Sequence, residues 1–304
     1  MAASRSSRRR FDDDDTTWEP VHVDDPATTD RHSDLMTDAT DERVWSTYRD
    51  AQRGPTPLPP WVVTDPRARD TDHGVMKTGK EADVSLVERS VDTENIHDSV
   101  GSPHALLAVK QYRSAEHRMF HRDAGYLEGR RVRKSREMRA MATRTEFGRE
   151  LIAGQWASAE FAVLSLLWQR GAAVPYPVQL LGTELMMEFI GSPDGVAAPR
   201  LAQIRPDRQH GIDLYRQMID VLLDLADAGY AHGDLSPYNV LVHEDRLVLI
   251  DLPQAVDLVG NPQGFEFLRR DCENVCSWFA AQGVAHADAY DLYQQVLRRV
   301  PGIG

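Results

Sequence analysis

Apolar and polar positions change their spacing along the chain, and the changes mark regions of different structure. After residue 60, short apolar runs of strand length come first and longer stretches with helical spacing follow. The expected elements are strand, turn and strand over 74–88, strands at 105–110 and 185–190, helices at 151–169 and 207–228, short strands at 240–243 and 247–250, and then two further helices. Strands followed by helices, with a connecting segment near residue 190, predict an α+β fold of two lobes.

The N-terminal region lacks this patterning. Between Phe11 and Asp50 there are 13 acidic and 3 basic residues, few apolar residues and no hydrophobic period. Such a stretch cannot bury enough apolar surface to offset the entropy lost on ordering. We therefore expect a disordered acidic tail over 1–55, then a proline-rich linker that opens one folded domain over 56–304. The expected lobes of that domain are an N-lobe over about 61–187 and a C-lobe over about 192–304.

Composition limits the possible functional classes. The chain has 304 residues, 41% of them hydrophobic, and no window approaches 18 consecutive apolar residues, so we expect no membrane span and no membrane partner. Two cysteines, Cys272 and Cys276, are too few for a disulfide scaffold, and at i and i+4 of a helix we expect them to pack in a core. The formal net charge of −12 disfavours binding of nucleic acid by the whole surface. A cytoplasmic protein is expected.

The strongest chemical signal lies around two short strands near residue 240. The stretch from His232 reads HGDLSPYN, and a hairpin turn near 244–245 would pair residue 239 with residue 250. Asn239 and Asp251 then emerge at the same end of the hairpin, and Asp234 lies on the loop that leads into that end. The alternative is an ordinary hairpin with solvated acidic ends.

Two carboxylates and one amide oxygen at a strand end favour a particular metal. These are hard oxygen ligands, which suit Mg²⁺ better than zinc. A metal held by Asn239 and Asp251, with Asp234 left as the base, is the arrangement that phosphoryl transfer uses. The sequence therefore indicates a phosphotransferase site.

A possible ion pair joins the two lobes of this prediction. Lys110 ends an apolar strand, where an unpaired ammonium would be costly. Glu160 stands at helical spacing from Trp156 and Leu164, which places it on the apolar face of the helix over 151–169. A carboxylate there needs a cation, and Lys110 is the natural candidate. The alternative is that Glu160 reaches the helix edge and Lys110 is a surface residue.

Two further segments carry weaker signals for nucleotide binding. The turn that begins TGK has one glycine and lacks a Walker pattern, yet Thr78 and Lys80 in it could contact phosphate oxygens. The strand and connector over 186–191 could read an adenine edge through the backbone of Glu188 and Ile190. An ordinary turn and an ordinary buried strand explain the two segments nearly as well.

Taken together, these motifs resemble the RIO family of atypical protein kinases, nearest to its Rio-one-like branch. The matching stretches, in chain order, are TGKEADV at 78–84, AVK at 108–110, MEFIG at 187–191, HGDLSPYN at 232–239, IDLPQAV at 250–256 and EFLRRDCENV at 266–275. They span residues 65 to 280 approximately. Small-molecule phosphotransferases share the HGD…N motif, but not the whole set. One departure is Leu252–Pro253, where the family usually has a small or β-branched residue and serine.

The resemblance implies a compact bilobal kinase fold, with a small β-rich N-lobe, a mainly helical C-lobe and ATP between them. It assigns Lys110 to the phosphates and Glu160 to Lys110, Asp234 to the catalytic aspartate, and Asn239 and Asp251 to Mg²⁺. It implies a serine/threonine-type kinase that phosphorylates itself or another protein. It also implies a possible ATPase reaction through a phosphoaspartate at Asp251.

Other functions remain open from the sequence. The chain could be an ATP-gated binding switch with slow turnover. It could also be a phosphotransferase of the aminoglycoside type, which would need an acceptor pocket after Asp251. The basic segment 113–149, with 11 Lys and Arg against 5 Asp and Glu, could contact RNA phosphates or present a solvated helix face.

Overall fold

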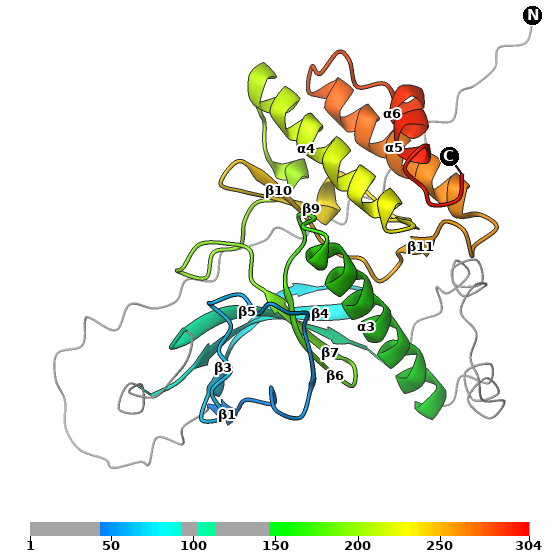
Figure 1. Cartoon of the computed structure of the whole chain (residues 1–304). Helices are drawn as coiled ribbons and strands as arrows, with labels where there is room; N and C mark the ends of the chain where they lie inside the picture. Colours follow the sequence, from blue (N-terminus) through cyan, green and yellow to red (C-terminus); the bar gives the residue numbers. More distant parts are fainter. Residues whose placement is uncertain (1–42, 93–101, 114–145, 304) are drawn as a thin grey trace, which may run out of the picture.

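The computed structural model describes residues 43–92, 102–113 and 146–303 of the chain (Figure 1). Its elements in chain order are β1 (Val44–Trp45), β2 (Gln52–Arg53), β3 (Arg69–Thr78), β4 (Ala82–Ser90), β5 (His104–Tyr112), α3 (Glu146–Gln169), β6 (Pro177–Leu181), β7 (Glu184–Glu188), η2 (Leu201–Gln203), α4 (Arg208–Asp227), β8 (Tyr230–Ala231), η3 (Pro237–Asn239), β9 (Val240–His243), β10 (Arg246–Leu249), β11 (Val256–Asp257), α5 (Gly264–Ala281) and α6 (Ala289–Leu297).

The N-lobe is built on one antiparallel sheet of seven strands in the order β1-β3-β4-β5-β7-β6-β2. Alternate residues of β5 face opposite sides, as expected for a strand. Leu107 and Val109 enter a core on one face together with Tyr48 and Val63. Ala108 and Lys110 face the other side, toward α3 and the C-lobe. The alternation therefore places Lys110 on the side of the sheet that meets the second lobe.

The expected boundary of the N-terminal tail at residue 55 is wrong. Residues from 43 onward belong to the sheet, because β1 pairs with β3 and β2 pairs with β6. Tyr48, between these strands, is buried and lies over the guanidinium of Arg89. Two-residue strands carry no periodicity of their own, and long-range pairing stabilises them. Residues 1–42 lie outside the described residues.

Helix α3 lies along the sheet and meets both lobes (Figure 1). By length and composition alone, its stretch Glu150–Gln169 could cross a membrane. In the structure it packs instead on β5, β6 and β7, and its buried Glu160 holds an ion pair with Lys110. The core of a globular protein explains its apolar character.

The C-lobe is mainly helical, as the sequence predicts. The side chain of Asp207 caps α4 by accepting a hydrogen bond from the His210 N–H at 2.9 Å. Gly229 follows the helix with φ +84°, the left-handed conformation that a glycine adopts readily. Helices α5 and α6 complete the lobe beside α4 (Figure 1).

The hairpin of β9 and β10 has the predicted register. His243 pairs with Arg246 and Val240 pairs with Leu249, so the ladder runs toward Asn239 and Ile250. The Ile250 N–H donates to the Asn239 carbonyl at 3.0 Å, which continues the pairing by one residue. The two turn residues have positive φ, as a tight two-residue hairpin turn requires. The hairpin therefore delivers residues 239 and 251 to one point.

Candidate active site

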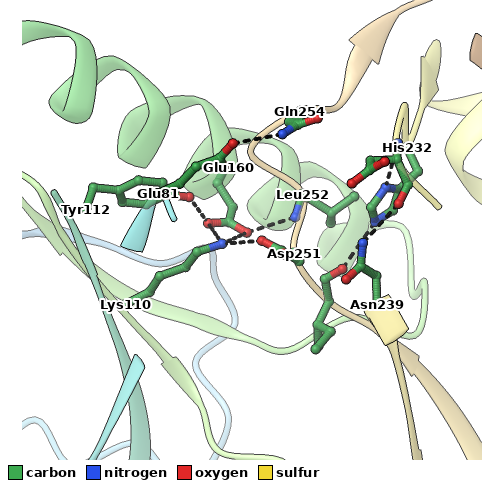
Figure 2. A network of polar contacts seen from close by, with 11 residues as sticks. Glu81, Lys110, Tyr112, Glu160, His232, Asn239, Asp251, Leu252 and Gln254 are labelled. Atoms are coloured by element: carbon green, nitrogen blue, oxygen red, sulfur yellow. Dashed lines mark hydrogen bonds and ion pairs between the residues drawn. The ribbon is translucent and has the colours of Figure 1, made fainter. Parts of the chain in front are cut away.

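A cleft between the two lobes is lined by three of the predicted site residues, Asp234, Asn239 and Asp251. Its walls come from the turn after β3, the loop before η3, and the segment after β10. The lining residues are Glu81, Asp234, Asn239, Asp251, Pro253 and Gln254. Figure 2 shows the ammonium of Lys110 beside this cleft, in contact with Glu160 and Asp251.

The predicted contact between Lys110 and Glu160 is present. The Lys110 Nζ lies 3.0 Å from the Glu160 carboxylate, and the side chains are 9% and 1% exposed. Glu160 also accepts a short hydrogen bond from the Tyr112 hydroxyl and another, at 2.8 Å, from the Leu252 N–H. These donors satisfy a carboxylate that would otherwise be costly to bury. Glu160 therefore fixes both the lysine and the backbone that follows Asp251.

Lys110 reaches Asp251 as well, across the cleft. Its Nζ donates to Asp251 Oδ1 at 2.6 Å (Figure 2). Burial by itself would raise the pKa of Asp251, but the charge and the hydrogen bond of Lys110 outweigh it and lower the pKa to about 2. Burial would likewise lower the pKa of Lys110, yet the Asp251 and Glu160 carboxylates raise it above its usual value. Lys110 and Asp251 therefore both stay charged at neutral pH.

The loop before the hairpin brings Asp234 and Asn239 to the same cleft. Asp234 has an exposed side chain, as a residue that meets an acceptor would need. The Asn239 side-chain amide donates to the Asp234 carbonyl at 2.9 Å. That bond directs the amide nitrogen back to the loop and leaves the side-chain carbonyl oxygen of Asn239 available to ligate a metal.

These residues suit a magnesium ion. Asp251 supplies a second carboxylate oxygen, since Lys110 contacts only one, and Asn239 supplies an amide oxygen. Both are hard oxygen donors of the kind that Mg²⁺ accepts. A bound Mg²⁺ would offset negative charge on a transferring phosphoryl group.

Helix α5 fixes the loop that carries Asp234, a feature that sequence reasoning missed. Asp271 is fully buried and accepts hydrogen bonds from the N–H groups of Gly233 and Leu235 at 2.9 and 3.0 Å. Burial raises the pKa of Asp271, although the two backbone donors oppose this. The loop thus rests on Asp271 on both sides of residue 234. The only sign of Asp271 in the sequence is its position, a charged residue on a helix face that is otherwise apolar.

His232 also orients this loop. It is fully buried, with Nε2 3.2 Å from the Ile250 carbonyl. The N–H of Asp234 donates to Nδ1 at 3.4 Å, so Nδ1 is the acceptor and the ring hydrogen lies on Nε2. His232 therefore joins the loop to the strand that ends at Asp251.

The turn after β3 lies over the cleft. Its two predicted phosphate-binding residues, Thr78 and Lys80, have different surroundings. Thr78 interacts with Asp83 across the turn and Lys80 is exposed at its tip. Glu81 instead reaches the opposite lobe, where its carboxylate accepts from Gln254 Nε2 at 3.0 Å (Figure 2). This bond connects the two lobes at the edge of the cleft.

The connector between the lobes keeps Glu188 and Ile190 outside the charged cluster. The Glu188 side chain turns back to accept from the Tyr176 N–H at 3.0 Å, and burial raises its pKa. The Ile190 carbonyl accepts from the Ala198 N–H at 2.9 Å. The predicted binding of the adenine of ATP by the backbone of Glu188 and Ile190 therefore stays a prediction.

Two other predicted features lie away from the site. Cys272 and Cys276 are buried in the C-lobe core, as expected for packing residues. Of the basic segment, Arg113 pairs with Asp83 at 2.5 Å and residues 146–149 begin α3. Residues 114–145 lie outside the described residues, and the RNA contact predicted for them stays a prediction.

The two-lobed fold, the lysine–glutamate pair and the aspartate–asparagine loop together define a phosphotransferase of the protein-kinase class. A family model for the RIO domain matches residues 95–292. The RIO-type serine/threonine-protein kinase Rio1 of Haloferax volcanii is 37% identical over 224 residues, which cover 73% of this chain and 68% of that protein. The chain therefore belongs to the RIO family of serine/threonine-protein kinases.

More distant relatives agree with this assignment. The serine/threonine-protein kinase RIO1 of Saccharomyces cerevisiae is 27% identical over 238 residues, which cover 74% of this chain and 47% of that protein. The solved Rio2 kinase-ADP/Mg²⁺-phosphoaspartate complex of Chaetomium thermophilum has the same fold, with a TM-score of 0.52 and 20% identity. The match covers 76% of this chain and 61% of that one. The bilobal α+β fold expected from the sequence is confirmed.

Proposed function

We propose that the protein transfers the terminal phosphoryl group of ATP to serine or threonine hydroxyls, in itself or in another protein, with Mg²⁺ as cofactor. Lys110 holds the phosphates, Asp234 orients or deprotonates the acceptor hydroxyl, and Asn239 and Asp251 hold the metal. The observation that supports this most strongly is the Lys110 ammonium, which lies between Glu160 and Asp251 at the edge of the cleft that contains Asp234. The cytoplasmic location stays an expectation from the sequence.

We also propose that Asp251 itself can accept the phosphoryl group. In that reaction a carboxylate oxygen of Asp251 forms a bond to the terminal phosphorus, and the bond from phosphorus to the bridging oxygen of ADP breaks. Water then hydrolyses the acyl phosphate and releases inorganic phosphate. The phosphoaspartate named for the Chaetomium thermophilum structure supports this, although that likeness concerns the fold. Asp251 is 37% exposed, so its free oxygen can be reached from the cleft.

The test traces the label from γ-labelled ATP and Mg²⁺ into three products. Wild-type protein should give acid-stable phosphoserine or phosphothreonine, acid-labile label on the protein, and free phosphate. Asp234→Asn should lose transfer to hydroxyl groups by about 10²-fold or more while ATP still binds. Asp251→Asn should lose the acid-labile label on the protein.

Asp213→Asn is a matched control, since the Asp213 side chain on α4 is 48% exposed and does not line the cleft. Transfer to hydroxyl groups at the wild-type rate by Asp234→Asn would contradict the proposed kinase mechanism. Label that is entirely acid-stable would remove the phosphoaspartate. Label found only on an added aminoglycoside would favour the small-molecule phosphotransferase, and slow phosphate release alone would favour the binding switch.

A further inference from the structure

Two basic side chains that the sequence analysis did not single out, Lys77 and Arg200, lie beside the charged cluster, one from each lobe. The motifs that define the site include neither residue. A role for these two cations in holding a nucleotide rests on the proposed function, because both lie within electrostatic range of Asp251 in the cleft.

The strand register fixes the position of Lys77. Lys77 on β3 pairs with Val84 on β4, and Val84 pairs with Lys110 on β5. Residues directly opposite one another across a sheet have their side chains on the same face. Lys77 and Lys110 therefore point toward the cleft from one row, two strands apart, which corresponds to about 10 Å between their backbones. Lys77 also comes directly before the turn at 78–81 that lies over the cleft.

Arg200 belongs to the opposite lobe, and its backbone lies against β9. Its backbone forms an isolated bridge with Leu241, two residues beyond Asn239 on β9. The Val242 N–H donates to the Pro199 carbonyl at 2.8 Å, and the Arg200 N–H donates to Gln203 Oε1 at 2.8 Å. The bridge and the Pro199 bond hold the main chain of Arg200 against the hairpin that carries the predicted metal ligands, and the Gln203 bond is local to residues 200–203.

Electrostatics connects the two cations with each other and with Asp251. Partial burial is the main cause that lowers the pKa of Lys77, and the positive charge of Arg200 lowers it further, while Asp251 opposes both. Arg200 is partly buried too, and it also lies within range of the Asp251 charge. In the described part of the chain, neither Lys77 nor Arg200 forms a salt bridge of its own, whereas Lys110 forms two.

We propose that Lys77 and Arg200 form a clamp for the phosphate chain of the nucleotide, with one cation from each lobe. Two like charges that face each other across a cleft repel one another until an anion lies between them. A polyphosphate suits this position because it carries several negative charges and must pass close to Lys110 and Asp251. The arginine fork can bind two phosphate oxygens at once, and the lysine supplies a single point charge.

The clamp predicts a loss of affinity that depends on the phosphates of the ligand. Binding of ATP, ADP and adenosine, each with Mg²⁺, would be measured by calorimetry, with adenosine also measured by displacement of a fluorescent nucleoside. Lys77→Met and Arg200→Met should each weaken ATP and ADP binding by about tenfold or more, because each removes one charged hydrogen bond to phosphate. Adenosine binding should change by less than about twofold, since adenosine carries no phosphate.

Conservative variants and a matched control distinguish charge from packing. Lys77→Arg and Arg200→Lys should keep most of the affinity for ATP. Arg205→Met, an exposed arginine on the same segment as Arg200, should bind all three ligands like wild type. Unchanged ATP and ADP affinity in Lys77→Met and Arg200→Met would overturn the clamp, and so would an equal loss for adenosine. A wild-type protein that binds none of the three ligands would instead overturn the proposed function.

Discussion

At the residue scale, three charged side chains in contact with one another form the centre of the site. Lys110 is buried between Glu160 and Asp251, and each carboxylate stabilises the charge of the lysine. Removing one of these three side chains leaves a buried charge without its partner. The loss of stability is then larger than the contact itself contributes. The sequence predicts Lys110–Glu160 because both stand at positions that should be apolar. It does not predict the direct contact of Lys110 with Asp251, which depends on how the two lobes meet.

The charge of Asp251 should make stability depend on acid pH. Its pKa is about 2 in the folded protein, below its ordinary value of 3.8. The stability that this carboxylate contributes is therefore present above about pH 4 and is lost as the pH falls through about 2. Asp251→Asn removes the titration. The difference in unfolding free energy between wild type and Asp251→Asn should narrow as the pH falls below about 4.

Urea unfolding at a series of pH values measures this difference. Asp213→Asn again serves as the control for the loss of one carboxylate, since its side chain is largely in contact with solvent. A difference between wild type and Asp251→Asn that stays constant, or that grows toward acid pH, would show that Lys110 does not hold the Asp251 carboxylate in its charged form.

At the element scale, local patterns predict most of the site's supports. The hairpin register follows from two short apolar strands and a two-residue turn, and it placed Asn239 and Asp251 correctly. Helical spacing placed Glu160 on the inner face of α3. Strands β1 and β2 could not be predicted, because their pairing partners lie far along the chain. The role of Asp271 could not be predicted for the same reason.

Helix α5 should control catalysis through Asp271. Asp271→Asn leaves one of the two N–H groups of the loop without its acceptor, so we expect a loss of about 1–3 kcal/mol in stability. We also expect a lower kcat with nearly unchanged ATP affinity, because Asp271 positions the loop of Asp234 and does not line the cleft. Glu273→Gln, an exposed site on the same helix, is the matched control. Equal kcat in both variants would contradict this positioning role.

The N-terminal strands should stabilise the N-lobe. A chain that begins at residue 56 loses β1, β2 and the buried Tyr48, and it also loses the bond from Gln179 Nε2 to Thr47 Oγ1 at 2.7 Å. Removing one large buried side chain costs about 3–5 kcal/mol, so this chain should unfold at a clearly lower urea concentration than one that begins at residue 43. Equal midpoints for the two chains would show that the segment contributes nothing.

At the scale of the whole molecule, the cleft is closed by contacts between the lobes. Lys110 bonds to Asp251, and Glu81 bonds to Gln254 (Figure 2). Family motifs allow the sequence to predict the residues on both sides of this cleft. Lys77 and Arg200 carry no motif, and only the sheet register and the bridge to β9 bring them there. The structure therefore adds the part of the site that depends on how the lobes pack.

The most direct test of the account is a crystal structure of the protein with Mg²⁺ and a non-hydrolysable ATP analogue. We expect the phosphates between the lobes, next to Lys110, and a magnesium ion about 2.0–2.1 Å from oxygens of Asn239 and Asp251. The Asp234 carboxylate should face the terminal phosphate. A nucleotide bound outside the cleft, or a metal that contacts neither Asn239 nor Asp251, would contradict the account.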